Sequence, residues 1–223
     1  DPSKRILVGV CGVPGSGKSS LALHVARKIN QLASEGRGEI GLETSSPIAV
    51  VVGMDGWHYT RERLSTFPDP QHARDRRGAH FTFDAVAFSN FVERLRNDVP
   101  PRSVHLAPSF SHSLKDPVED DIEVSPGHRI VIVEGLYCNL SVGEWVRGAR
   151  LFDERWVFEV DRQAAKERLR IRHVLTGVAK DDEEAIWRAE NNDLPNGDYL
   201  LSNLYEPVVR IQSLEDPSWA GAE

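Results

Sequence analysis

The chain has 223 residues, of which 40% are apolar and 27% are charged, and its formal net charge is −7. This composition is typical of a folded globular protein, and the sequence holds no apolar run long enough for a transmembrane helix. The acidic balance argues against a nucleic-acid-binding surface, because binding a polyanion requires a surplus of clustered Lys and Arg. We therefore expect one domain spanning residues 1–223, with neither a nucleic-acid nor a membrane partner.

The two cysteines, Cys11 and Cys138, each stand beside an apolar, strand-like run. Buried, reduced thiols are expected there, rather than a disulfide or metal ligands. This pattern favours a reducing, cytoplasmic environment. The chain begins at Asp1 and its single methionine is Met54, which is consistent with a fragment of a longer protein.

The first predicted element is a strand over residues 6–10, a short apolar run of the kind that a parallel sheet buries on both faces. A helix is expected over 18–33, because its apolar residues recur on one stripe: Leu21, Val25, Ile29 and Leu32. Residues 34–47 are rich in Gly, Ser and Glu and predict an exposed loop.

Between this strand and this helix lies a glycine-rich loop that ends in Lys-Ser. It comprises Gly12, Val13, Pro14, Gly15, Ser16, Gly17, Lys18 and Ser19, and Ser20 follows. The glycines of such a loop let backbone N–H groups surround phosphate oxygens, and the helix N-terminus adds positive partial charge. Lys18 is expected to reach the β- and γ-phosphates and Ser19 to bind Mg²⁺. The motif predicts an ATP site, since a plain glycine turn does not require Lys-Ser.

A second buried strand is predicted over residues 49–53, and Asp55 follows it directly. Ligands of open α/β sheets bind at the carboxyl ends of strands, where a carboxylate can take the proton of an attacking hydroxyl. The alternative is that Asp55 caps a turn. We favour the catalytic role, because the following residues, Gly56, Trp57, His58 and Tyr59, are interpreted as a pocket wall.

The next predicted helix covers residues 84–97, with Asp84 as its cap and an apolar face of Phe88, Phe91, Val92 and Leu95. Residues 129–134 predict a third buried strand, which ends at Glu134. A carboxylate at this strand end lies where P-loop folds place an acidic group near magnesium. The alternative is a loop carboxylate without a role.

A fourth strand is predicted over residues 155–160, followed by Asp161 as the cap of an arginine-rich helix. Arg168 and Arg172 are four residues apart and therefore share a helical face, as cations that close over phosphates would need. A solvated basic face is the alternative. The last predicted helix covers 182–191. The polar stretch after it, with Asn192, Asp193 and Asn196, either closes over a ligand or forms a hydrogen-bonded loop.

Together these motifs resemble the phosphoribulokinase and uridine kinase family of P-loop kinases, which also includes the bacterial-type pantothenate kinases. The resemblance extends from Ile6 to about Tyr205. It is carried by the phosphate loop, by the arginine-rich helix and by the segments 54–58, 76–84 and 134–137. It implies a three-layer α/β fold, with a mostly parallel sheet flanked by helices and a helical lid at about 165–197. It also implies transfer of the γ-phosphoryl group of ATP, with Mg²⁺, to a hydroxyl of a small metabolite.

By this resemblance, Asp55 matches the acidic residue at the substrate hydroxyl, and Lys18 and Ser19 match the ligands of ATP and magnesium. Arg168 and Arg172 match a lid helix that folds over the phosphates. We therefore assign Asp55, Lys18 and Arg168 to catalysis, Arg172 to the nucleotide, and Ser19 and Glu134 to the metal.

The acceptor side is expected in an insertion at about 56–125. Its segment Pro108–His112 resembles the aromatic-and-histidine segment that contacts the base in uridine kinases, but the aromatic residue expected at its start is missing. This departure weakens a specific assignment to uridine or cytidine. The acceptor-site candidates are Asp55, His58, Tyr59, Arg76, Arg77, His80, His112 and Glu134, and a structural role is the alternative for the aromatic and basic ones.

A nucleoside-like acceptor is favoured by the resemblance, and a sugar or pantothenate is the next alternative. A rival from another class is a nucleotide-dependent switch that hydrolyses ATP or GTP without a small-molecule acceptor. The sequence lacks the guanine-reading Asn-Lys-x-Asp pattern of GTPases and the Leu-Ser-Gly-Gly signature of transporter ATPases. We expect a monomer or a homodimer.

Overall fold

The computed structural model describes residues 4–36 and 46–214. Its centre is a five-stranded sheet in the order β2-β5-β1-β6-β7, in which every neighbouring pair is parallel. A separate antiparallel hairpin consists of β3 and β4. The strands are β1 (Ile6–Gly12), β2 (Ala49–Gly53), β3 (His105–Ser111), β4 (Asp116–Val124), β5 (Ile130–Glu134), β6 (Glu154–Glu159) and β7 (Val209–Gln212).

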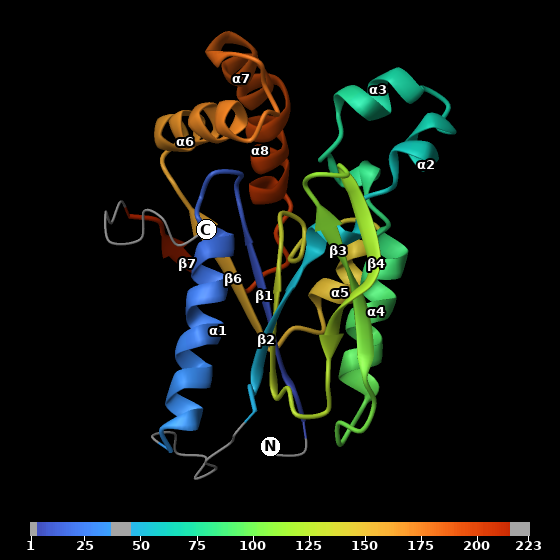
Figure 1. Cartoon of the computed structure of the whole chain (residues 1–223), viewed down its shortest axis with the longest axis vertical. Coiled ribbons are helices and arrows are strands. Elements are labelled where there is room, and N and C mark those ends of the chain that lie inside the picture. Colours follow the sequence, from blue (N-terminus) through green and yellow to red (C-terminus); the bar gives the residue numbers. More distant parts are fainter. Residues whose placement is uncertain (1–3, 37–45, 215–223) are drawn as a thin grey trace.

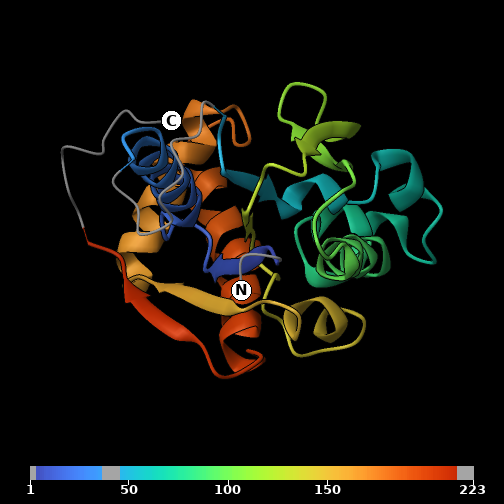
Figure 2. The ribbon, with the colours of Figure 1, turned by 90° about the horizontal axis from the view of Figure 1, so that it is seen from below.

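Helices lie on both sides of the sheet, with α1 on one side and α4 and α5 on the other (Figures 1 and 2). The predicted three-layer α/β fold is therefore confirmed. Helices α6 to α8 and the short helices α2 and α3 gather at one end of the molecule (Figure 1). The helices are α1 (Lys18–Ser34), α2 (Arg61–Ser65), α3 (Pro70–Asp75), α4 (Ala85–Asn97), α5 (Trp145–Ala149), α6 (Arg162–Leu175), α7 (Asp182–Arg188) and α8 (Leu194–Ser202). Three short turns complete them: η1 (Met54–Trp57), η2 (His80–Thr82) and η3 (Ala189–Asp193).

The apolar strands are buried because each face of the sheet packs against its own layer. Along β1, Leu7 and Cys11 belong to the core beneath α4 and α5, whereas Val8 and Val10 belong to the core beneath α1. Side chains of a strand alternate between faces, so a continuous apolar run supplies both cores. None of the helices in the described ranges is long and apolar enough to span a bilayer.

The predicted caps of two helices are present. The carboxylate of Asp84 accepts a hydrogen bond from the N–H of Ala87 at 2.8 Å, and that of Asp161 accepts one from the N–H of Gln163 at 2.9 Å. These bonds satisfy N–H groups that have no partner within the first helical turn. The predicted apolar face of α4 is buried in full: Phe88, Phe91, Val92 and Leu95.

Helix α1 packs on the sheet through the predicted residues Leu21, Val25 and Ile29, while Leu32 is 36% exposed. The buried residues of α1 are two alanines, Ala22 and Ala26. Small side chains there let the helix approach the sheet closely. Of the predicted loop at 34–47, residues 37–45 lie outside the described residues.

The polar stretch after Asn191, for which closure over a ligand or a hydrogen-bonded loop was expected, is helical. The chain passes from α7 through a π-helical turn, Ala189–Asp193, into α8. Pro195 is tolerated because it lies in the first turn of α8, where its missing N–H is not needed. The asparagines indicated a loop by their residue type, but their side chains bond to a distant arginine, which is described below.

A buried ion pair fastens the start of β1 to the hairpin side of the core. The Arg5 side chain is 1% exposed, and its Nη1 donates to Asp98 Oδ2 at 2.9 Å. Burial alone raises the pKa of Asp98, but hydrogen bonds from His105, from Arg5 and from two backbone N–H groups hold it well below its usual value. Nothing in the sequence pattern indicated this cluster.

We predict that Arg5→Met destabilises the fold, because the substitution keeps the apolar stem but leaves the Asp98 carboxylate buried without its cation. Removing one partner of a buried pair costs about 3–5 kcal/mol of unfolding free energy. Urea denaturation at neutral pH measures the difference. Arg102→Met, at an exposed position of the same loop, is the matched control and is expected to shift stability by about 0.5 kcal/mol or less.

The pH dependence follows from the low pKa of Asp98 in the folded protein. Its ionised form stabilises the fold above the unfolded-state pKa of about 3.9, and this contribution is lost as the pH falls toward the lower folded-state pKa. The two variants should therefore differ less in acid than at neutral pH. Equal stability of Arg5→Met and Arg102→Met at neutral pH would show that the pair does not stabilise the fold.

Candidate functional site

The parallel register brings the carboxyl ends of three strands together. Glu134, the last residue of β5, stands beside Gly53 of β2 on one side and beside Val10 of β1 on the other. The segments that follow these strands are η1 with Asp55 and the glycine-rich loop of residues 12–19. Side chains and loops from these strand ends therefore meet at one edge of the sheet, where open α/β sheets bind ligands.

The glycine-rich loop has the geometry of a phosphate cradle. Gly15 and Gly17 adopt positive φ angles of 79° and 85°, which side chains disfavour. A Cβ atom on Gly12 would lie 2.7 Å from Phe158, so only glycine allows this close approach. Helix α1 starts after Gly17 with no side-chain cap and no acidic residue in its first turn. Its N-terminus is therefore suited to an anion.

The serines of the loop differ in their surroundings. Ser16 is fully buried, and its hydroxyl has no hydrogen-bond partner among the described residues. A buried hydroxyl without a partner is costly, which fits a ligand group arriving at the loop. Ser19 is exposed, and Ser20 is partly exposed. Val13 and Pro14 are buried, and both contact the backbone of α8 at Gly197.

Lys18, Ser19 and Glu134 form the centre of the site. Lys18 Nζ lies 4.0 Å from Glu134 Oε1, and both side chains are largely buried, at 14% and 13% exposure. Burial raises the pKa of Glu134, as does the negative charge of Asp55, whereas Lys18, a hydrogen bond from Ser19 and the charge of Arg172 lower it; the net shift is upward. The same electrostatic neighbourhood thus holds two carboxylates and two cations.

Asp55 is exposed in η1, the turn that follows β2 directly. Its carboxylate is close enough to raise the pKa of Glu134, so it borders the centre of the site without being buried in it. An exposed carboxylate beside a phosphate cradle is accessible to an incoming hydroxyl. Gly56 is required beneath it, since a Cβ atom there would lie 2.1 Å from the carbonyl oxygen of Pro108.

The donor set fits Mg²⁺. The Ser19 hydroxyl and the Glu134 carboxylate are hard oxygen ligands, which Mg²⁺ prefers together with water and substrate phosphates. In the part of the chain that the structure describes, no group of three or more His, Cys, Asp or Glu residues is arranged to hold a metal ion.

Arg168 lies at the phosphate loop. Its Nη1 donates to the carbonyl oxygen of Gly15 at 3.1 Å and to Ser213 Oγ at 3.0 Å. Arg172, one turn further along α6, is exposed, and its charge acts on Glu134. Helix α6 itself touches the loop, because a Cβ atom on Gly15 would lie 2.9 Å from the carbonyl oxygen of Ala165. The two arginines therefore stand on the nucleotide side.

His58 packs directly against Asp55. Its Nδ1 lies 2.9 Å from the Asp55 carbonyl oxygen, and its ring lies 3.8 Å from the ring of Phe83 and 5.0 Å from that of Phe110. Burial lowers the pKa of His58. The interpretation of residues 56–59 as a pocket wall is wrong for Trp57, which is 5% exposed and packs in the core against Phe88.

Arg77 joins the chain after α3 to the hairpin. Its Nη2 donates to Asp116 Oδ1 at 2.8 Å and to the Tyr59 carbonyl oxygen at 3.1 Å, and its guanidinium lies 5.5 Å from the Phe110 ring centroid. Tyr59 is half-buried, and the guanidinium of Arg63 lies 5.9 Å from its ring centroid. Burial, followed by the charge of Asp84, raises the pKa of Tyr59.

The two remaining predicted histidines stand apart from Asp55. His80 stacks on Tyr199 of α8, with ring centroids 4.4 Å apart, and burial and the charge of Arg76 lower its pKa. His112 is exposed just beyond β3, with its ring 5.5 Å from Phe110. The described contacts bring neither ring to the phosphate loop.

Sequence reasoning missed the aromatic partners of His58, which are the rings of Phe83 and Phe110. Phe110 lay in a segment that the sequence had indicated, but its partners come from elements distant in the chain.

Burial raises the pKa of Cys11 to about 12 and that of Cys138 well above its usual value, so both are neutral thiols. Both are buried and free, as expected.

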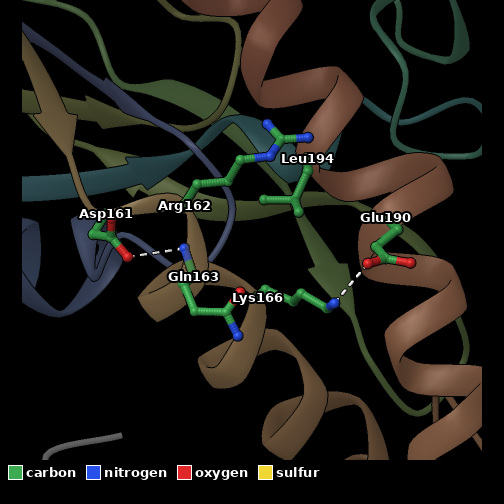
Figure 3. Close-up of a pocket in the computed structure, with 6 residues that line it drawn as sticks. All are labelled: Asp161, Arg162, Gln163, Lys166, Glu190 and Leu194. Atoms are coloured by element: carbon green, nitrogen blue, oxygen red, sulfur yellow. Dashed lines mark hydrogen bonds and ion pairs between the residues drawn. The ribbon is translucent and has the colours of Figure 1, made fainter.

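A separate pocket lies between the start of α6 and the π-helical turn (Figure 3), lined by Asp161, Arg162, Gln163, Lys166, Glu190 and Leu194. Its cations are paired: Lys166 points to Glu190 at 2.5 Å, as Figure 3 shows, and Arg162 bonds to Asp198 at 2.8 Å. None of its residues is among the catalytic, nucleotide, metal or acceptor-site candidates predicted from the sequence.

Comparison with known proteins agrees with this geometry. No protein-family model matches the chain. A Schizosaccharomyces pombe protein provisionally named a uridine kinase is 37% identical over 211 residues, which cover 95% of this chain and 84% of that protein. The ATP-dependent kinase-like protein notR' of Aspergillus versicolor is 45% identical over 167 residues, covering 74% of this chain and 95% of the relative.

Among solved structures, the chain resembles YFH7 of Saccharomyces cerevisiae, provisionally described as a P-loop-containing kinase. The TM-score is 0.82 at 22% identity, over 96% of this chain and 95% of that one, a likeness that concerns the fold. The two sequence relatives carry the family assignment. The chain therefore belongs to the phosphoribulokinase and uridine kinase family of P-loop kinases and is an ATP-dependent phosphotransferase.

Proposed function

We propose that the chain transfers the γ-phosphoryl group of ATP, in the presence of Mg²⁺, to a hydroxyl of a nucleoside-like molecule. The observation that carries this proposal is the placement of an exposed carboxylate, Asp55, beside Lys18 and Glu134 at adjacent strand ends. A phosphate cradle alone serves hydrolysis as well as transfer. A base placed beside the cradle and open to solvent favours an acceptor hydroxyl.

In this mechanism the acceptor oxygen bonds to the γ-phosphorus while the bond from that phosphorus to the β,γ-bridging oxygen breaks and ADP leaves. Asp55 takes the proton of the acceptor hydroxyl. Lys18 and Arg168 offset negative charge on the transferring group, and the N–H groups of the loop orient it. Ser19 and Glu134 are suited to hold Mg²⁺, which when bound neutralises charge on the β- and γ-oxygens.

An acceptor with a planar ring is supported by the aromatic surface near Asp55. We name His58 and the two rings it contacts the aromatic wall; the centroid of its ring lies 3.8 Å from that of Phe83, which is buried behind it in the core, and 5.0 Å from that of Phe110. Phe110 is only partly buried, and Arg77 lies over its ring. Nucleobases stack on such rings, whereas sugars and pantothenate have no aromatic face. The relative named for uridine adds support.

A panel of acceptors tests this choice. The purified chain is incubated with Mg²⁺, ATP and, separately, uridine, cytidine, adenosine, fructose, glycerate or pantothenate, and phosphorylated products are identified by mass spectrometry. We expect a nucleoside monophosphate from at least one nucleoside. A product from a sugar, glycerate or pantothenate alone would replace the acceptor class and retain the kinase. ADP formation without any product would favour the nucleotide-dependent switch.

We predict that Asp55→Asn lowers turnover by about 10²- to 10⁴-fold, the usual contribution of a general base, while ATP binding is retained. Steady-state kinetics and a nucleotide titration measure the two effects separately. Asp75→Asn, at another exposed aspartate, the last residue of α3, is the matched control and should behave as the unmodified chain. Unchanged turnover in Asp55→Asn would remove this residue from the mechanism.

Glu134→Gln tests the proposed metal site. Glu134 is a proposed Mg²⁺ ligand and also accepts a hydrogen bond from Ser19, the other proposed ligand. Its carboxylate is lost in Glu134→Gln, so the Mg²⁺ concentration needed for half-maximal rate should rise by about 10- to 100-fold or more, since the loss of even a hydrogen-bond partner of a metal ligand has this effect. A titration of MgCl₂ at saturating ATP measures this. An unchanged Mg²⁺ requirement, with any loss of rate confined to kcat, would exclude Glu134 from metal binding.

A further inference from the structure

Arg76 joins two parts of the molecule that are distant in the sequence. Its Nε donates to Asn192 Oδ1 at 3.2 Å, and its Nη2 donates to Asn196 Oδ1 at 3.0 Å. Asn196 Nδ2 donates in turn to Asn192 Oδ1 at 3.3 Å, and Asn192 Nδ2 to the carbonyl oxygen of Arg77 at 3.0 Å. We call Arg76, Asn192 and Asn196 the amide clamp.

On one side, the amide clamp is fixed to the phosphate loop. Asn196 is 5% exposed, and the next residue, Gly197, packs so closely on Val13 that a Cβ atom would lie 2.8 Å from its Cγ1. The backbone of α8 therefore rests on the loop itself. Figure 1 shows α8 at the end of the sheet where the loop lies.

The π-helical turn ties the amide clamp to α6 as well. Asn192 lies within this turn, and its neighbour Asp193 accepts from His173 Nε2 at 2.9 Å. His173 follows Arg172 on α6, the helix that carries Arg168. Turns of this kind recur at functional sites because they reorient side chains within a helix. Both helices that contact the phosphate loop thus meet at the clamp.

On the other side, the amide clamp holds residues 77–83, which we call the acceptor loop. The Thr82 carbonyl oxygen accepts from the Tyr59 N–H at 2.9 Å, and the Tyr137 hydroxyl donates to the Gly78 carbonyl oxygen at 3.0 Å. Directly after the loop, the N–H of Asp84 donates to the Trp57 carbonyl oxygen at 2.8 Å. The acceptor loop therefore braces η1, the turn that carries Asp55.

We propose that Arg76 is a positioning residue that couples nucleotide binding to the order of the acceptor loop. Nucleotide phosphates fix the phosphate loop, and this favours the arrangement in which α8 rests on it and presents both asparagine oxygens to Arg76. When the Arg76 guanidinium donates to both oxygens, it stabilises residues 77–83 and, through them, the turn with Asp55. Such a link means that nucleotide binding favours acceptor binding. By thermodynamic linkage, acceptor binding favours nucleotide binding by the same factor.

Hydrogen exchange measures this coupling without any acceptor. Amides of the acceptor loop bond locally, for example Gly78 N to Thr82 Oγ1 at 3.0 Å and Thr82 N to the Ala79 carbonyl oxygen at 2.8 Å. With Mg²⁺ and a non-hydrolysable ATP analogue, exchange of these amides should slow by about 5-fold or more, as typical coupling energies allow. In Arg76→Gln this slowing should vanish while the phosphate loop is still protected.

Arg74→Gln is the matched control and should keep the slowing, because Arg74 lies two residues away on α3 and its side chain donates to Gln71 of the same helix at 3.1 Å. Arg76→Lys should keep part of it, because a single ammonium cannot engage both asparagines as a fork does. Melting temperatures of all variants separate coupling from loss of fold, and Asn192→Ala provides a second break of the clamp should Arg76→Gln unfold.

The proposal would be overturned if nucleotide slowed amide exchange in the acceptor loop of Arg76→Gln and Asn192→Ala as much as it does in the unmodified chain. An acceptor loop that does not respond to nucleotide in the unmodified chain, while the phosphate loop does, would also overturn it. The coupling rests on the proposed function only in naming residues 77–83 as the acceptor side. A failed acceptor panel with intact coupling would therefore contradict the proposed function alone.

Discussion

The site depends on the register of three neighbouring parallel strands, β2, β5 and β1, which pairs Glu134 with Gly53 on one side and with Val10 on the other. The positions of the other groups in the site follow from this register. It sets the Glu134 carboxylate 4.0 Å from Lys18 Nζ in a largely buried position, with Asp55 on the next strand end. A shift of one residue would turn these side chains to the opposite face of the sheet. The two apolar cores that hold the register are therefore also what holds the reacting groups in place.

Much of this arrangement could be predicted from the sequence, because its signals are local. Continuous apolar runs mark strands buried on both faces, and Asp84 and Asp161 mark helix starts that the structure confirms. The phosphate loop could be predicted for the same reason, since its residues form one continuous segment and act through their own backbone. Asp55 and Glu134 were found because strand ends of a parallel sheet converge, a rule that needs no knowledge of side-chain packing.

The acceptor side could not be predicted in the same way, because it is built from contacts between distant segments. His58 meets Phe83 and Phe110 across three elements, and Trp57, next to His58 in the chain, points into the core instead. Asn192 of the π-helical turn and Asn196 of α8 are of a residue type that indicates a loop, although their amide oxygens accept hydrogen bonds from Arg76, which is 116 residues from Asn192 in the sequence. Residue type alone does not distinguish a polar side chain that faces solvent from one that bonds to a half-buried arginine.

Phosphorus NMR of a reaction with Mg²⁺, ATP and uridine tests the central claim most directly, because it follows the fate of the γ-phosphoryl group itself. If Asp55 delivers an acceptor hydroxyl to the phosphate cradle, loss of the γ-phosphate resonance will be matched by growth of a phosphomonoester resonance, and little inorganic phosphate will form. The account would be contradicted if inorganic phosphate were released and no phosphomonoester formed, at the same rate with uridine and with every other nucleoside used in its place.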